Sequence, residues 1–329
     1  MTTAAGTAAR RPALATWRNI LRDYPLIPLT ALLVLLIVAV EIGQPRTVSP
    51  SWFGVILRAA IPLAILAGCQ TLTMLTGGID LSVGYVASMA GFVTATLVAP
   101  LGVPLAILAS LAAAAIAGLI SGVGVGVFRV HPLIMTLGMG LIVLGAANVW
   151  QLRMVQTGSG VPIELRDIGV RLLDNVVPYS LIVFVPLAAV ILVGLRRSGY
   201  GRLLFAIGDN PIAARLSGAR SWQVLIVLYV ISALMAGIAG LLYSGLGNTA
   251  SVTLVASQLL PSVAAAVIGG TSILGGRGTY TGTILGALIL TVLTALLTIL
   301  GLPEPWRQIV FGSIVVLVAA AYTRATEEA

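Results

Sequence analysis

The segment YPLIPLTALLVLLIVAVEIG, residues 24–43, contains one charged side chain, Glu41, in an otherwise uncharged run. An α-helix of about 20 predominantly apolar residues is long enough to cross the hydrocarbon core of a bilayer. Nine further apolar runs follow, near 52–76, 80–99, 103–128, 132–151, 178–195, 222–246, 257–274, 281–300 and 307–323. The sequence therefore predicts an all-α, polytopic membrane protein of about ten transmembrane helices.

Composition supports this class and excludes several kinds of chemistry. The chain is 59% apolar and only 9% charged, whereas a soluble domain carries roughly a quarter charged residues. All 18 basic residues are Arg, so the chain has no P-loop lysine for ATP and no lysine for a Schiff base. A single His and a single Cys rule out metal sites built mainly from those ligands. No paired-carboxylate or Ser/His/Asp arrangement is recognisable, so we expect no catalytic residue, no metal and no enzymatic activity.

The distribution of Arg predicts how the chain lies in the membrane. With ten spans and cytoplasmic termini, twelve Arg fall on cytoplasmic segments, five on external segments, and Arg58 within the second span. Cytoplasmic loops are enriched in basic residues, so we expect both termini inside and no nucleic-acid partner for the net charge of +8. The expected organisation is a cytoplasmic tail at 1–22, a transmembrane domain at 23–324 and a cytoplasmic tail at 325–329.

Two long polar stretches differ in character. Residues 152–177 mix acids with Arg and are expected outside, whereas residues 196–221 contain five Arg and one acid and are expected inside. Within this basic internal loop, residues 210–216 have a helical pattern. Asp209 or Asn210 is suited to cap that helix, with Pro211 at its first position.

Glycine-rich sequences interrupt the apolar pattern at two places, GGIDLSVG at 77–84 and GGTSILGGRG at 269–278. Non-helical backbone at membrane depth is tolerated where protein or a water-filled cavity satisfies its amide groups, so both breaks are candidates for a transport path. Tight turns that use glycine would explain them equally well. Asp80 is either a functional acid or a cap for the following helix. The candidate break residues are Gly77, Gly78, Asp80, Ser82, Gly269, Gly270 and Thr271.

Uncharged polar residues within apolar runs are a second group of candidates. Gln70, Thr73, Asn148 and Gln258 could line a path for a hydroxyl-rich solute, or form hydrogen bonds between helices. The fourth span, 103–128, contains four closely spaced glycines and could itself be interrupted. No chain of acids and histidines suggests proton relay, which counts against a proton-coupled transporter.

Several of these stretches together resemble a known family. TLTMLTGGIDLSVG at 71–84, PLIMTLG at 132–138, GRLLFAIGDNPIAARLSG at 201–218, AAAVIGGTS at 264–272, GGRG at 275–278 and Gly282-Thr283 are similar to motifs of the ribose-type permeases of ATP-binding-cassette (ABC) importers. These are the membrane subunits of binding-protein-dependent sugar importers. The resemblance covers about residues 50–320, with the motifs in the family's order.

The resemblance implies a permease of the bacterial inner membrane that moves a sugar or similar neutral polar solute using ATP hydrolysed elsewhere. It implies four partners: a cytoplasmic ATP-binding subunit, a periplasmic or lipid-anchored solute-binding protein, a second permease subunit (favoured as a homodimer) and membrane lipid. ATP would be bound by the partner, so the chain needs no cofactor. The implied contacts of the internal loop with the ATP-binding subunit are Gly208, Asn210, Ala213, Ala214, Arg215, Ser217 and Gly218.

The sequence departs from the family pattern at two places. Pro211-Ile212 stands where an acid usually precedes the Ala pair, and Gln258-Leu259-Leu260-Pro261 stands where many sugar permeases carry an acid pair. The second departure leaves permeases for nucleosides or branched-chain amino acids open as alternatives. An ion-coupled secondary transporter is the alternative from another class.

Overall fold

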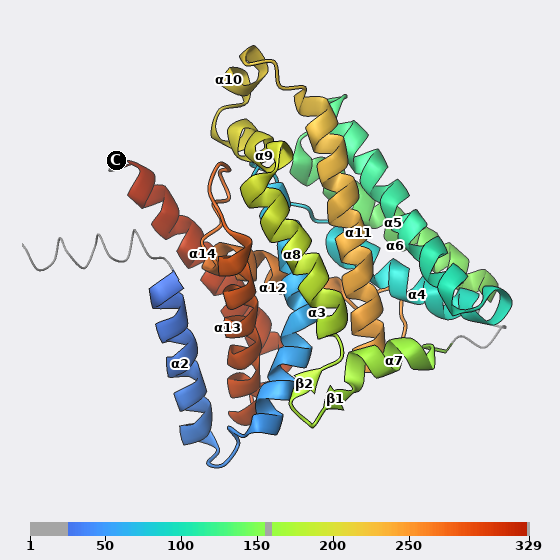
Figure 1. Cartoon of the computed structure of the whole chain (residues 1–329), viewed down its shortest axis with the longest axis vertical. Coiled ribbons are helices and arrows are strands. Elements are labelled where there is room, and N and C mark those ends of the chain that lie inside the picture. Colours follow the sequence, from blue (N-terminus) through green and yellow to red (C-terminus); the bar gives the residue numbers. More distant parts are fainter. Residues whose placement is uncertain (1–25, 155–159, 328–329) are drawn as a thin grey trace, which may run out of the picture.

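The computed structural model describes residues 26–154 and 160–327, so the expected tail at 1–22 lies outside the described residues (Figure 1). The described chain is almost entirely helical. Its elements are α2 (Leu26–Gly43), α3 (Pro50–Met74), α4 (Val83–Leu101), α5 (Val103–Gly126), α6 (Pro132–Met154), α7 (Ile163–Val170), β1 (Leu172–Leu173), β2 (Val177–Pro178), α8 (Leu181–Arg197), α9 (Gly199–Asp209), α10 (Pro211–Leu216), α11 (Ser221–Gly247), η2 (Ala256–Gln258), α12 (Leu259–Ile268), α13 (Tyr280–Ile299) and α14 (Glu304–Glu327). The all-α class is confirmed.

The number of spans is lower than expected. Among the described residues, α2, α3, α4, α5, α6, α11 and α13 are long and apolar enough to cross a membrane, which makes seven. The pair α8 and α9, bent by 67°, would be an eighth if it formed one broken span. The run 257–274 yields only the ten-residue α12, because the helix ends at Gly269 and Gly270 turns the chain with a φ of +86°. A helix of that length covers about 15 Å, half of the hydrocarbon core.

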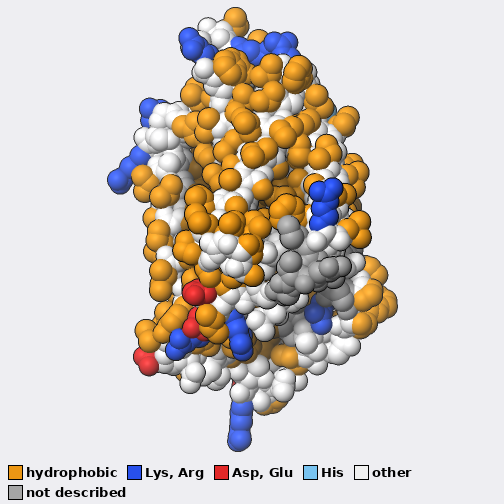
Figure 2. All heavy atoms as spheres, turned by 90° about the vertical axis from the view of Figure 1, so that its right-hand side faces the viewer, with side chains coloured by type: hydrophobic (Ala, Val, Ile, Leu, Met, Phe, Trp, Pro, Cys, Tyr) orange, Lys and Arg blue, Asp and Glu red, His pale blue; other side chains and the backbone are white. Residues whose placement is uncertain are grey.

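The centre of the bundle is formed by α3, α4 and α11. About two thirds of the most apolar window of α3 and of α4 is buried within the chain, and 61% of that of α11, but only 11% of α2. Accordingly, α2 lies at the edge of the bundle beside α13 (Figure 1). Apolar side chains cover the middle of the face in Figure 2, and most charged side chains lie toward its two ends. This distribution is what a membrane-spanning bundle requires.

Glycines in α5 bring it close to α11. The fourth span is a continuous helix, so the suggested interruption is wrong. A Cβ at Gly122 would lie 2.7 Å from Ile226 Cα, and one at Gly126 would lie 2.8 Å from the Trp222 oxygen. Gly118, four residues before Gly122, meets the Tyr229 carbonyl in the same way. Small residues spaced by four allow helix backbones to approach closely inside a membrane, and that is the use of these glycines.

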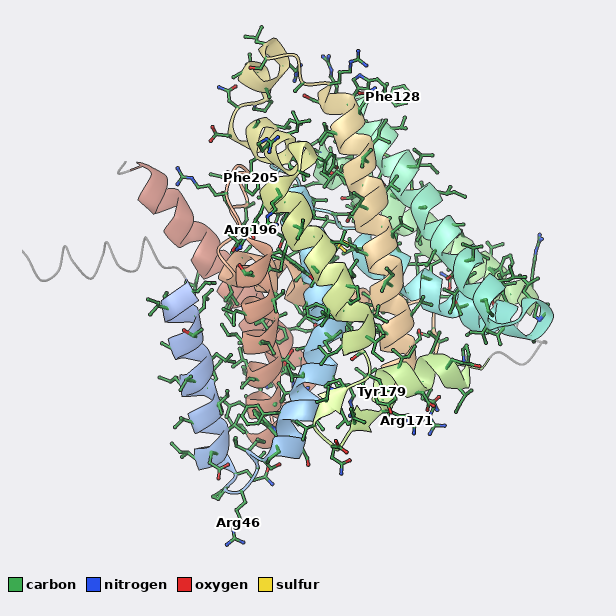
Figure 3. The ribbon with its side chains drawn as sticks, in the orientation of Figure 1. Arg46, Phe128, Arg171, Tyr179, Arg196 and Phe205 are labelled. Atoms are coloured by element: carbon green, nitrogen blue, oxygen red, sulfur yellow. The ribbon has the colours of Figure 1, made fainter. Side chains whose placement is uncertain are left out.

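The end of the bundle opposite α10 is formed by α7, the short β1–β2 hairpin and the α2–α3 turn (Figure 1). Arg46, Arg171 and Tyr179 lie there, while Phe205 lies toward the other end (Figure 3). Arg171 forms an ion pair with Asp167 at 3.1 Å. Arg58, the basic residue expected inside a span, donates a 2.6 Å hydrogen bond from Nη1 to the Val170 carbonyl.

Candidate functional site

The first glycine break is a buried connection between α3 and α4, held by side chains from other helices. Gln70 on α3 donates from Nε2 to the Asp80 carbonyl at 2.8 Å and accepts from the Asp80 amide at 3.2 Å. Thr136 on α6 accepts from the Leu81 amide at 3.0 Å. These bonds satisfy non-helical backbone groups at a depth where water could not do so. Gln70 is thus placed to order the break.

Asp80 joins the break to α11. Its Oδ1 accepts from the Ser82 amide at 3.0 Å and from the Ser82 hydroxyl at 2.6 Å, and its Oδ2 accepts from the Ser232 hydroxyl at 2.9 Å. The N-cap position of α4 is Ser82, so Asp80 is not the helix cap suggested by the sequence. Instead, its buried carboxylate holds the start of α4 against α11. Ser232 gave no signal in the sequence, because a serine in an apolar helix is common.

The second break lies directly beside the first. The Gly276 amide donates a 3.0 Å hydrogen bond to the Leu75 carbonyl at the end of α3. Within the second break, the Ser272 amide donates to the Arg277 carbonyl at 2.9 Å. Gly269 packs closely on Gly282 of α13, where an added Cβ would lie 2.5 Å from the Gly282 carbonyl carbon. The two glycine sequences, almost 200 residues apart, therefore form one continuous patch of irregular backbone.

The basic internal loop packs on that patch. Gly208, near the end of α9, lies so close to the two breaks that an added Cβ would overlap the Leu75 carbonyl oxygen and lie 2.6 Å from the Gly276 amide nitrogen. A Cβ on Gly275 would in turn lie 2.8 Å from the Gly208 oxygen. Only a residue without a side chain permits three backbones to meet here. A displacement of α9 must therefore act on both breaks.

The helix expected in the internal loop is present as α10, and its cap is resolved. Asn210 Oδ1 accepts from the amides of Ile212 and Ala213 at 3.1 and 3.0 Å, with Pro211 at the first helical position. This confirms the expected cap and assigns it to Asn210. Of the other expected contact residues, Ala214 is buried, whereas Ala213, Arg215, Ser217 and Gly218 are exposed.

Two residues of α10 that the motif comparison did not single out are its most exposed apolar side chains. Ile212 is 69% exposed and Leu216 is 86% exposed. They are separated by four residues and so share one face of the helix. An apolar pair on a short helix at the end of a basic loop is the signal that could have identified them.

A cavity of about 340 Å³ lies between α3, α11, α12, α13 and α14, in the half of the bundle remote from α10. It contains three Thr from one face of α13 and the expected path residue Gln258, whose Oε1 lies 3.5 Å from the Tyr243 hydroxyl. Its polar lining residues are Tyr243, Gln258, Thr291, Thr294, Thr298 and Arg307. The lining has no acid, and its hydroxyl and amide groups suit a polar solute without positive charge.

The remaining candidates are distributed around the breaks, with one exception. Thr73 is buried and donates to the Cys69 and Gln70 carbonyls of its own helix at 3.1 Å. Thr271 is also buried. Asn148 is exposed on α6, so it does not join the other polar residues. Among residues 26–154 and 160–327, no group of three His, Cys, Asp or Glu side chains could hold a metal ion.

Comparison with known proteins gives consistent results. Residues 53–319 match the model of a family described as branched-chain amino acid transport system/permease component. The chain is 35% identical to the ribose import permease protein RbsC of Escherichia coli over 88% of this chain and 90% of RbsC. It is 32% identical to the fructose import permease protein FrcC of Rhizobium meliloti, over 89% and 84% of the two chains. It is 31% identical to the fructose import permease protein FruG of Bifidobacterium longum, over 99% and 97%. No solved structure shows a significant match.

Proposed function

The chain belongs to the family of branched-chain amino acid transport system/permease components, and from this premise we propose that it is the membrane subunit of an ABC sugar importer. It is a multi-pass protein of the bacterial inner membrane. Permeases of this family work with a separate ATP-binding subunit and a solute-binding protein. In the proposal, ATP hydrolysis by the first partner drives the helices of this chain to expose a solute path alternately to the two sides.

The observation that supports this proposal most directly is the position of α9. Its Gly208 lies against both the Leu75 carbonyl and the Gly276 amide, so the basic loop and the two breaks form one mechanical unit. We infer that α10 lies in the cytoplasm and docks on the ATP-binding subunit through Asn210, Ala213, Arg215, Ser217 and Gly218 together with the exposed Ile212 and Leu216. Movement of the partner would then reach the helices through Gly208 and Ala214, which face inward.

The orientation follows from the same proposal. With α10 in the cytoplasm, the α7 and β1–β2 end lies outside, where a solute-binding protein would dock. The charge distribution of the sequence supports cytoplasmic termini. We further propose that two copies of this chain form the permease, with the path residues between or near them, because a single subunit offers only a small cavity.

A neutral sugar is the solute class that the cavity favours. Its polar groups are hydroxyls, an amide and one guanidinium, all able to form hydrogen bonds with sugar hydroxyls, and no acid is present to attract a cationic solute. The relatives named as ribose and fructose importers support the same class. The proposed path residues are Gln258 in this cavity and, at the breaks, Gln70, Thr73, Gly77, Gly78, Asp80, Ser82, Gly269, Gly270 and Thr271. Asn148 is the weakest of the original candidates because it faces outward on α6.

Reconstitution tests the proposed function. The chain is incorporated in proteoliposomes with the ATP-binding subunit and solute-binding protein encoded beside it, and uptake of radiolabelled ribose and fructose is measured with internal ATP. We expect uptake that requires ATP and the binding protein, and ATP turnover that rises when the binding protein carries solute. Uptake by the chain alone under a proton or sodium gradient would instead identify a secondary transporter.

The cavity has its own test, the double substitution Gln258→Leu/Thr294→Val. Each change removes one hydrogen-bonding group with little change in volume, at a net cost of about 0.5–1.5 kcal/mol per bond. We therefore expect transport to fall about tenfold, while association with the ATP-binding subunit is unchanged. Thr30→Val on the exposed helix α2 is the matched control, since it removes the same hydroxyl far from the cavity. Wild-type uptake by the double variant would exclude this cavity from the path.

A further inference from the structure

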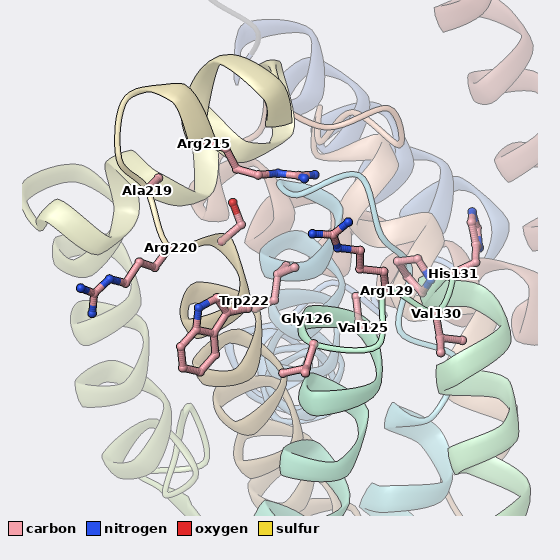
Figure 4. Close-up of a pocket in the computed structure, with 13 residues that line it drawn as sticks. Val125, Gly126, Arg129, Val130, His131, Arg215, Ala219, Arg220 and Trp222 are labelled. Carbon is pink, nitrogen blue, oxygen red and sulfur yellow. The ribbon is translucent and has the colours of Figure 1, made fainter.

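A second and larger pocket lies at the α10 end of the bundle. Its volume is about 830 Å³, and its walls come from the end of α5, the turn into α6, α10 and the start of α11 (Figure 4). Three of its lining residues are Arg129, Arg215 and Arg220, and none of its lining residues is acidic. Because Gln258 and the α13 threonines do not line it, this pocket is separate from the proposed solute cavity.

Two of the arginines face the same space. In Figure 4 the guanidinium groups of Arg129 and Arg215 point toward one another across the pocket, while Arg220 points away. Arg129 has a φ of +57°, which is uncommon outside glycine, and the Val130 amide closes the turn by a 3.0 Å bond to the Gly124 carbonyl. Tertiary structure thus places this cation. Like charges that converge repel one another, and an anion between them would remove that cost.

A third group in the pocket also lacks a partner. The Ser221 hydroxyl oxygen is buried and has no hydrogen-bond partner among the described residues, and Ser221 is the first residue of the 27-residue helix α11. Helix N-termini favour anions, because their free amides and the helix dipole attract negative charge. Two guanidinium groups, a hydroxyl and a helix start form a set of donors suited to the oxygens of a phosphate group.

The surroundings of the pocket indicate where the phosphate would come from. Phe128, between the end of α5 and Arg129, is 74% exposed, and Trp222, which lines the pocket, is 47% exposed. Aromatic side chains of this kind concentrate at the membrane interface, and basic pockets between transmembrane helices on the cytoplasmic side suit anionic headgroups. We propose that this pocket binds the phosphate-bearing headgroup of an anionic phospholipid of the inner leaflet, with the acyl chains along the exposed apolar surface of α5 and α11.

Lipid binding to the full-length purified chain tests the proposal. Native mass spectrometry measures retention of phosphatidylglycerol and of phosphatidylcholine by the wild type and by Arg129→Gln/Arg215→Gln. We expect the wild type to prefer phosphatidylglycerol, and the variant to bind it about 30-fold more weakly, given the contribution of each Arg near an anionic surface. Arg196→Gln/Arg197→Gln is the matched control: it removes two exposed charges from the end of α8, outside the pocket, and should bind like the wild type.

Further arms separate the alternatives. Arg129→Lys/Arg215→Lys should restore most of the binding, which excludes a folding defect as the cause of its loss. Displacement of the lipid by inorganic phosphate or soluble glycerophosphoglycerol at equal concentration would show a soluble anion as the ligand and overturn the lipid assignment. Equal losses in the pocket and control variants would reduce the effect to overall charge. If the pocket variant lost the ATP-binding subunit but kept the lipid, the pocket would face an acidic protein surface instead.

Discussion

Gly208→Ala is expected to abolish ATP-driven uptake while leaving the ATP-binding subunit attached. The added methyl group would overlap the Leu75 carbonyl oxygen and lie 2.6 Å from the Gly276 nitrogen. Both neighbours are backbone atoms, so they cannot rotate away, and α9 must move off the two breaks. Overpacking typically costs about 1–3 kcal/mol, and here that cost falls on the contact proposed to transmit motion. We expect uptake to fall at least about tenfold, measured in proteoliposomes.

Gly194→Ala is the matched control for this substitution. Gly194 lies in α8, and no atom would lie within 4 Å of its added Cβ. Alanine is the better helix former by about 1 kcal/mol, so this variant should transport normally and be at least as stable as the wild type. Co-purification of the ATP-binding subunit with both variants separates failed transmission from failed assembly. Normal uptake by Gly208→Ala would disprove the proposed route through α9.

Leu216→Asp is expected to prevent assembly with the ATP-binding subunit. Leu216 is 86% exposed on the face of α10 that also presents Ile212, so the free chain should tolerate the change. Burying a charge without a partner in an interface is costly, and truncating or replacing a central anchor residue typically costs at least about 2 kcal/mol of binding energy. We expect at least about thirtyfold weaker association, measured by co-purification and by light scattering of the reconstituted complex.

Leu173→Asp provides the control for this second prediction. Leu173 is an exposed leucine in β1, at the opposite end of the bundle. The same substitution there should leave association with the ATP-binding subunit unchanged. Unimpaired assembly of the Leu216 variant, with both proteins equally abundant in the membrane, would mean that α10 is not the docking helix.

The local structure of this chain follows closely from its sequence. The apolar runs gave the positions of the helices, and the Asn-Pro sequence at 210–211 predicted the start of α10, because capping depends only on adjacent residues. The number of spans was overestimated because the run 257–274 combines a short helix with a glycine turn of similar hydropathy. The glycines of α5 were misinterpreted as an interruption for a related reason: their use becomes apparent only when α11 lies against them.

The sequence by itself determined that this chain is a bundle of apolar helices with two glycine breaks and a basic, helix-forming loop, because composition, periodicity and caps are local properties. Only the tertiary structure decided that Leu75, Gly208 and Gly276 meet, that Asp80 binds Ser232, and that Arg129 and Arg215 face one pocket. These contacts join residues far apart in the chain. Which segments meet is set by how the helices pack on one another, and no single segment contains that information.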